Sequence, residues 1–162
     1  MGTNILLGVD ALHYAAEAAD MARELCHAPD DKVIVLHVHE FAVGRFGRMQ
    51  VDCPETDADR LVTSIKTSLT DVGIKAEVEI REAHVGHIAS TIIEAADHHN
   101  AWMIVLGSAH STDLPHVPFG SISLKVLHLA KRPVLVVPRR AVTEASREQT
   151  GVRRLATEPA AG

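Results

Sequence analysis

Glycine and serine residues flank a loop in the last third of the sequence, where an apolar run gives way to an amphipathic stretch. Gly107 follows the apolar run, Gly120 and Ser121 begin the amphipathic stretch, and Ser123 lies two residues further on. Glycine lets the backbone approach a ligand closely, and the first turn of a helix has N–H groups without intrahelical partners. Such N–H groups and serine hydroxyls donate hydrogen bonds to anions. The spacing therefore predicts an anion site between Gly107 and the helix start.

The rest of the sequence alternates between strand and helix patterns. Continuous apolar runs are typical of strands buried on both faces, and a run that alternates apolar and polar residues is typical of an edge strand. The continuous runs are 5–9, 33–38, 102–106 and 134–137, and the alternating run is 74–81. Amphipathic helices are expected between them, at 12–26, 56–72, 86–97 and 121–130. The stretch 40–53 shows no clear periodicity and is predicted to be a long mobile loop.

This β-α-β-α-β-α-β-α-β order predicts an α/β fold, a Rossmann-like, doubly wound, five-stranded parallel sheet with right-handed crossovers. The alternating third strand belongs at an edge, and the wholly apolar first and fourth strands belong in the middle. The strand order 3-2-1-4-5 satisfies both conditions and places the topological switch point between the first and fourth strands. Asp10 follows the first strand and Gly107 ends the fourth, so both are expected to face the same crevice.

Composition excludes several classes of protein. The formal net charge is −5 without a long basic run, which argues against a general nucleic-acid binder. No apolar run approaches the roughly 18 residues of a membrane span, and the start of the sequence lacks a signal-peptide pattern. The two cysteines, Cys26 and Cys53, form no disulfide framework, so a cytoplasmic protein is expected. Residues 1–138 are predicted to form one domain, and the Arg-bearing stretch 139–162 a solvated C-terminal tail.

Several stretches resemble the universal stress protein family over roughly residues 3–138: ILLGVD, VLHVHE, WMIVLGS and GSISLKVLHLAKRPVLVVP. Nucleotide-binding members of this family carry a glycine, two residues, a second glycine, nine residues, and then Gly-Ser or Gly-Thr. Here Gly107, the nine residues 111–119 and Gly120-Ser121 match this motif, and His110 occupies the position of the second glycine. The resemblance implies an adenine nucleotide alpha hydrolase-like fold.

The resemblance also implies roles for individual residues. Asp10 and Val38 would contact ribose and adenine, Val38 through its backbone, and the phosphates would lie beside the altered loop that contains His110. The residues that would hold the phosphates are Gly107, Gly120, Ser121 and Ser123. The implied ligand is ATP or AMP, with Mg²⁺ if ATP is bound, and the implied role is regulation in a stress response. Without a general base or nucleophile that has a supporting partner, at most slow ATP hydrolysis is expected.

An alternative function, a nucleotide-free dimeric interaction protein of the same fold, stays open. Histidine at position 110 carries a Cβ where the family motif has glycine, and the loop between Gly107 and Ser121 contains no Lys or Arg. His110 and His116 would supply positive charge only when protonated, near a pH of about 6.5 for an unperturbed imidazole. The last strand, residues 133–138, is a short edge of valine and leucine, and the family forms homodimers through such a strand.

Eleven histidines raise the question of a metal site. His37 and His39 lie on one face of a predicted strand, and His84 and His87 lie near a helix start. Two ligands do not make a zinc site, which needs three or four converging groups. No metal site is therefore predicted. The resemblance implies a structural role for His37, because the family commonly has histidine at this position.

Overall fold

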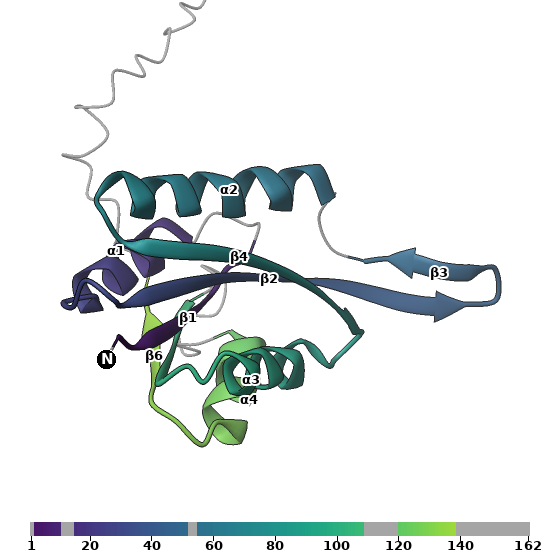
Figure 1. The fold of residues 1–162 in the computed structure, drawn as a ribbon. Helices are drawn as coiled ribbons and strands as arrows, with labels where there is room; N and C mark the ends of the chain where they lie inside the picture. The colour runs from purple at the N-terminus through teal and green to yellow at the C-terminus, as the bar shows by residue number, and fades with distance from the viewer. Residues whose placement is uncertain (1, 11–14, 52–54, 109–119, 139–162) are drawn as a thin grey trace, which may run out of the picture.

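A computed structural model describes residues 2–10, 15–51, 55–108 and 120–138 as six strands and four helices (Figure 1). The elements in chain order are β1 (Asn4–Gly8), α1 (Ala15–Leu25), β2 (Lys32–Gly44), β3 (Gly47–Gln50), α2 (Glu55–Asp71), β4 (Lys75–His84), α3 (Ile88–His98), β5 (Met103–Gly107), α4 (Ser121–Leu129) and β6 (Val134–Val137). The alternation of strands and helices predicted from the sequence is confirmed. Residues 139–162, predicted as the tail, lie outside the described residues.

Five of the strands are parallel neighbours in the order β4-β2-β1-β5-β6. This is the predicted order, with β1 in the centre and the alternating β4 at an edge. A helix lies between each two parallel strands that follow one another in the chain, as expected for crossovers. The prediction of a wholly parallel, five-stranded sheet is wrong in one respect, because a sixth strand, β3, pairs antiparallel with β2.

The predicted loop at 40–53 is, through residue 51, mostly a β-hairpin. β2 continues to Gly44, and β3 returns along it after a turn at Arg45 and Phe46. Gly47, the first residue after this turn, has φ +109°, a conformation that glycine adopts without steric cost. The sequence pattern hid the hairpin because both of its faces are exposed, so apolar and polar residues need not alternate. Figure 1 shows β3 and the end of β2 projecting well beyond the rest of the sheet.

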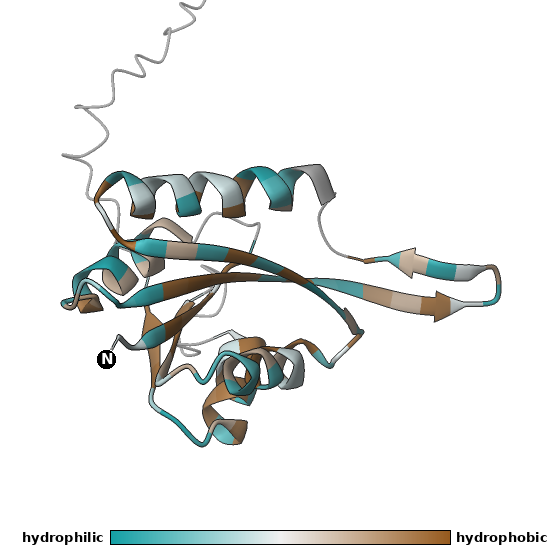
Figure 2. Cartoon of the chain, viewed as in Figure 1, coloured by the Kyte–Doolittle hydropathy of each residue, from teal (hydrophilic) through white to brown (hydrophobic). Residues whose placement is uncertain are grey.

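Helices cover the sheet on both faces and produce two cores (Figure 2). Side chains of β1 and β2 alternate between them, since successive residues of a strand point to opposite faces. Ile5, Leu7 and Val33 pack with α1 and α2, and Leu6 and Ile34 pack with α3 and α4. The core contains no buried Trp, Tyr or Phe among the described residues and consists of aliphatic side chains and alanines, in a sequence with only 3% aromatic residues. No helix in the described ranges is long and apolar enough to cross a membrane.

Candidate functional site

β1 and β5 end beside the middle of β2, and α4 begins next to them. A cavity of about 300 Å³ lies there. Its lining includes Asp10 after β1, Val38 in β2, Gly107 at the end of β5, and Gly120, Ser121 and Ser123 at the start of α4. The structure therefore brings six of the seven predicted site residues to one cavity. His110, the seventh, lies outside the described residues.

The start of α4 presents backbone donors to this cavity. Gly120 is the N-cap residue in an extended conformation, φ −66° and ψ 158°, and no side chain caps the helix there. The N–H of Leu124 donates to the carbonyl of Gly120 at 3.0 Å. The N–H groups of Ser121 to Ser123 thus precede this helical hydrogen bond, as in any first turn. The positive end of the helix dipole and these donors favour an anion.

Backbone groups of Val38 face the edge of β2 next to the end of β1. The N–H of Val9 donates to the carbonyl of Leu36 at 2.9 Å, and the N–H of Val51 donates to the carbonyl of Glu40 at 2.8 Å. Backbone groups of alternate strand residues share an edge, so Val38 directs its N–H and C=O to the edge between these two contacts. A planar heterocyclic ring at this edge would meet one hydrogen-bond donor, the N–H of Val38, and one acceptor, its C=O. The Val38 side chain is buried in the core beneath α3.

His37 joins β2 to the end of β1. Its Nδ1 atom lies 3.0 Å from the carbonyl oxygen of Val9, which accepts the hydrogen bond when Nδ1 carries the proton. The His37 and His39 rings meet edge to face, with centroids 4.6 Å apart. His37 is buried, and this contact gives it the structural role that the resemblance implied.

Glu40 is a lining residue that the sequence analysis missed, because the predicted strand ended at Val38. Its Oε1 atom accepts a hydrogen bond from the N–H of Gly86 at 2.8 Å, which ties β2 to the segment before α3. The same cavity is lined by Ile88 and Ile92 of α3 and by Leu106 of β5. No periodicity past residue 38 marks the continuation of the strand, so the sequence carried no clear signal for Glu40.

The described lining carries two carboxylates, Asp10 and Glu40, and neither Lys nor Arg. Attraction for an anion from this lining therefore comes from the start of α4. Among the described His, Cys, Asp and Glu residues, no group of three or more is placed to hold a metal ion. The pair His84 and His87 has ring centroids 6.0 Å apart.

Sequence comparison relates the chain to known proteins. The family model described as "Universal stress protein family" matches residues 1–138. A universal stress protein of Mycolicibacterium smegmatis is 28% identical over 143 residues, which cover 82% of this chain but only 47% of that relative. Universal stress protein YxiE of Bacillus subtilis is 26% identical over 150 residues, 85% of this chain and 99% of that relative.

Structural comparison finds the same fold in solved proteins. The MJ0577 protein of Methanocaldococcus jannaschii superimposes with a TM-score of 0.67 at 24% identity, covering 85% of this chain and 96% of that chain. A universal stress protein of Archaeoglobus fulgidus in complex with dAMP has a TM-score of 0.56 at 20% identity, covering 83% and 96%. A universal stress protein in complex with cAMP has a TM-score of 0.53 at 19% identity, covering 84% of this chain and 96% of that chain. At these identities the superpositions show a shared fold.

Proposed function

The chain belongs to the universal stress protein family, and we propose that it binds an adenine mononucleotide where β1 and β5 end beside the middle of β2. The observation that carries this proposal is the convergence of Asp10, Val38, Gly107 and the start of α4 on one cavity. Its volume of about 300 Å³ is at the lower end of the range for small-molecule sites, which suits a mononucleotide. The dAMP and cAMP complexes of two structural neighbours support the same ligand class.

Each part of the ligand has a partner of suitable chemistry. The N–H of Val38 donates to a ring nitrogen of adenine, and its C=O accepts from the exocyclic amine. Asp10 accepts from a ribose hydroxyl. Ile88, Ile92 and Leu106 give the base an apolar surface. The phosphates lie at the start of α4, where backbone N–H groups and the hydroxyls of Ser121 and Ser123 donate.

The ligand is AMP, or ATP accompanied by Mg²⁺, which offsets the repulsion between a triphosphate and the two lining carboxylates. The biological role is regulation in a stress response. In the described lining no nucleophile has an adjacent base, so hydrolysis of ATP is at most slow.

Isothermal titration calorimetry tests this proposal directly. AMP and ATP with Mg²⁺ are titrated into the protein at pH 6 and pH 7.5, with GMP as the control, since guanine presents the opposite order of donor and acceptor to Val38. We expect heat with AMP and weaker or no heat with GMP. Binding at pH 6 alone would implicate His110 or His116. Absence of heat with millimolar AMP and ATP at both pH values contradicts the proposal.

A second candidate is a nucleotide-free dimeric interaction protein that associates through β6. β6 ends the strand order, and α4 beside it exposes Leu124, Leu127 and Leu129. Pairing of β6 (residues 133–138 with the flanking prolines) between two copies would cover these side chains. Light scattering at micromolar concentration tests this candidate, and a strict monomer contradicts it.

A further inference from the structure

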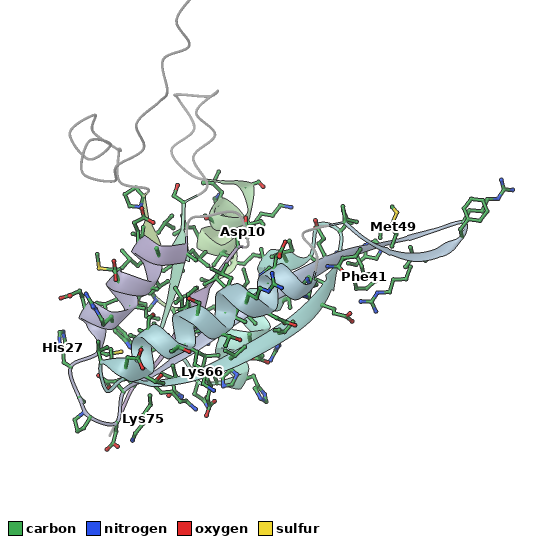
Figure 3. All side chains as sticks on the ribbon, turned by 90° about the horizontal axis from the view of Figure 1, so that it is seen from above. Asp10, His27, Phe41, Met49, Lys66 and Lys75 are labelled. Carbon is green, nitrogen blue, oxygen red and sulfur yellow. The ribbon has the colours of Figure 1, made fainter. Side chains whose placement is uncertain are left out.

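The hairpin arm, residues 41–51, is the least covered apolar segment of the described protein. Phe46 is 101% exposed, Met49 66%, Val43 65% and Val51 51%. β4 pairs with β2 only as far as Phe41, so the outer half of the arm is a two-stranded ribbon. Figure 3 shows Phe41 at its base and Met49 further out, with the arm standing clear of the helices. A two-stranded ribbon alone is marginally stable in water, so a partner that covers it would be strongly favoured.

The outer edge of β3 lacks the usual protection against pairing. β3 ends the strand order, with β2 as its neighbour. The edge strand contains neither Lys nor Pro, the residues that commonly block such edges. Its one charged residue, Arg48, lies over the Phe41 ring at 3.9 Å and forms an ion pair with Glu82. These contacts hold the guanidinium against one face of the arm, where it does not block the outer edge of β3.

We propose that β3 pairs antiparallel with β3 of a second copy, around a two-fold axis at Met49. The hydrogen bond from the N–H of Val51 to Glu40 sets the alternation of the strand. Met49, two residues earlier, therefore directs its backbone to β2, and positions 48 and 50 direct theirs to the outer edge. With Met49 opposite Met49, position 48 of each copy lies opposite position 50 of the other. The backbone N–H and C=O groups of both positions then point towards the second copy and can form the hydrogen bonds of an antiparallel pair.

This register also suits the side chains. Arg48 lies opposite Gln50 of the second copy, whereas a shift that placed Arg48 opposite Arg48 would set like charges together. On the opposite face, Met49 and Val51 of both copies form one apolar cluster with Gly47 leaving room between them. The association uses β3 and not β6, so it is a different contact from the β6 pairing of the second candidate function.

Cysteine cross-linking on the full chain tests the register. In a Cys26→Ser, Cys53→Ser background, Met49→Cys is compared with Phe46→Cys under mild oxidation. Residues opposite each other at the axis have Cα atoms about 4.5 Å apart, within reach of a disulfide. The two Phe46 positions would be about 20 Å apart, six residues along the strand. We expect Met49→Cys to give cross-linked dimer at least tenfold faster than Phe46→Cys.

Equal or faster cross-linking at the more exposed position 46 would mean random collision and would overturn the proposal. Sedimentation velocity of Met49→Asp gives a second measurement, because two carboxylates at the axis oppose association. Its matched control is Met21→Asp on α1, where Met21 is 38% exposed. We expect loss of one association step in Met49→Asp and its retention in Met21→Asp. Identical sedimentation of wild type and Met49→Asp also contradicts the proposal.

Discussion

The imidazole of His37, in the middle of β2, and the carbonyl of Val9, just after β1, are hydrogen-bonded at 3.0 Å. We predict that His37→Leu lowers the free energy of unfolding by about 1–3 kcal/mol, because a buried carbonyl loses its donor. Urea unfolding measures the change. The control is His27→Leu, an exposed histidine whose side chain should matter by no more than about 0.5 kcal/mol. Equal effects of the two substitutions would contradict the role assigned to His37.

Ser121 provides a test of where the phosphates lie. We predict that Ser121→Asp weakens AMP binding by about tenfold or more, which corresponds to about 1.4 kcal/mol. An aspartate in the first turn suits the helix dipole, so α4 should remain folded, while its carboxylate repels a phosphate. Ser64→Asp, at an exposed position on α2, is the control and should leave AMP affinity unchanged. If both variants bind AMP as wild type does, the phosphates lie elsewhere.

Asp31 connects the start of β1 to the segment before β2. Its carboxylate accepts hydrogen bonds from the N–H of Ala28, the N–H and hydroxyl of Thr3, and the N–H of His27, at 2.8 to 2.9 Å. These bonds, that from Ala28 first, hold the pKa of Asp31 far below its usual range. A depressed pKa in the folded state stabilises the protein at pH values above the unfolded pKa of about 3.9.

The pH dependence of Asp31→Asn follows from this sign. At pH 7 the amide cannot accept all four hydrogen bonds, so we predict a lower urea midpoint for the variant. The wild-type advantage should shrink as the pH falls below about 4, towards the folded-state pKa. Urea midpoints of both proteins between pH 7 and pH 2 measure the difference. A difference that stays constant over this range would show that ionisation of Asp31 is not its source.

Arg132, just before β6, binds the C-terminal end of α3 and the residues that follow it. Its guanidinium donates to the carbonyl of Ala96 at 2.8 Å and to that of Ala101, and it pairs with Asp97. Charged donors to carbonyls at a helix C-terminus also suit the helix dipole. We predict that Arg132→Ala lowers the free energy of unfolding by about 2 kcal/mol. Lys131→Ala, at the exposed neighbouring position, should change it by less than about 0.5 kcal/mol, and a similar loss would contradict the prediction.

Sequence patterns located most of the strands, because the burial of one or both faces of a strand determines which of its positions are apolar. Ile5 to Val9 and Val33 to Val38 are apolar since both faces of these strands are covered, and Lys75 to His84 alternates since it is an edge. The hairpin arm escaped detection because exposure removes that constraint. Similarly, the topological switch point placed Asp10 and Gly107 together, whereas Glu40 was missed because its position depends on how far β2 continues. The hydrogen bonds of Asp31 and Arg132 join distant segments, which periodicity does not reveal.

Gly8 in β1 lies against Leu106 in β5, and both line the candidate nucleotide cavity. A Cβ at position 8 would lie 2.5 Å from Leu106 Cδ2, so Leu106 would have to move. We predict that Gly8→Ala lowers the free energy of unfolding by about 1–3 kcal/mol through overpacking and weakens AMP binding by reducing the cavity. Gly44→Ala is the matched control, because its nearest contact would be the Gly47 carbonyl oxygen at 4.0 Å. Urea unfolding and calorimetry on both variants separate the two effects. Unchanged stability with weaker binding would mean that Leu106 moves freely into the cavity, and unchanged binding would mean that the nucleotide does not reach this wall.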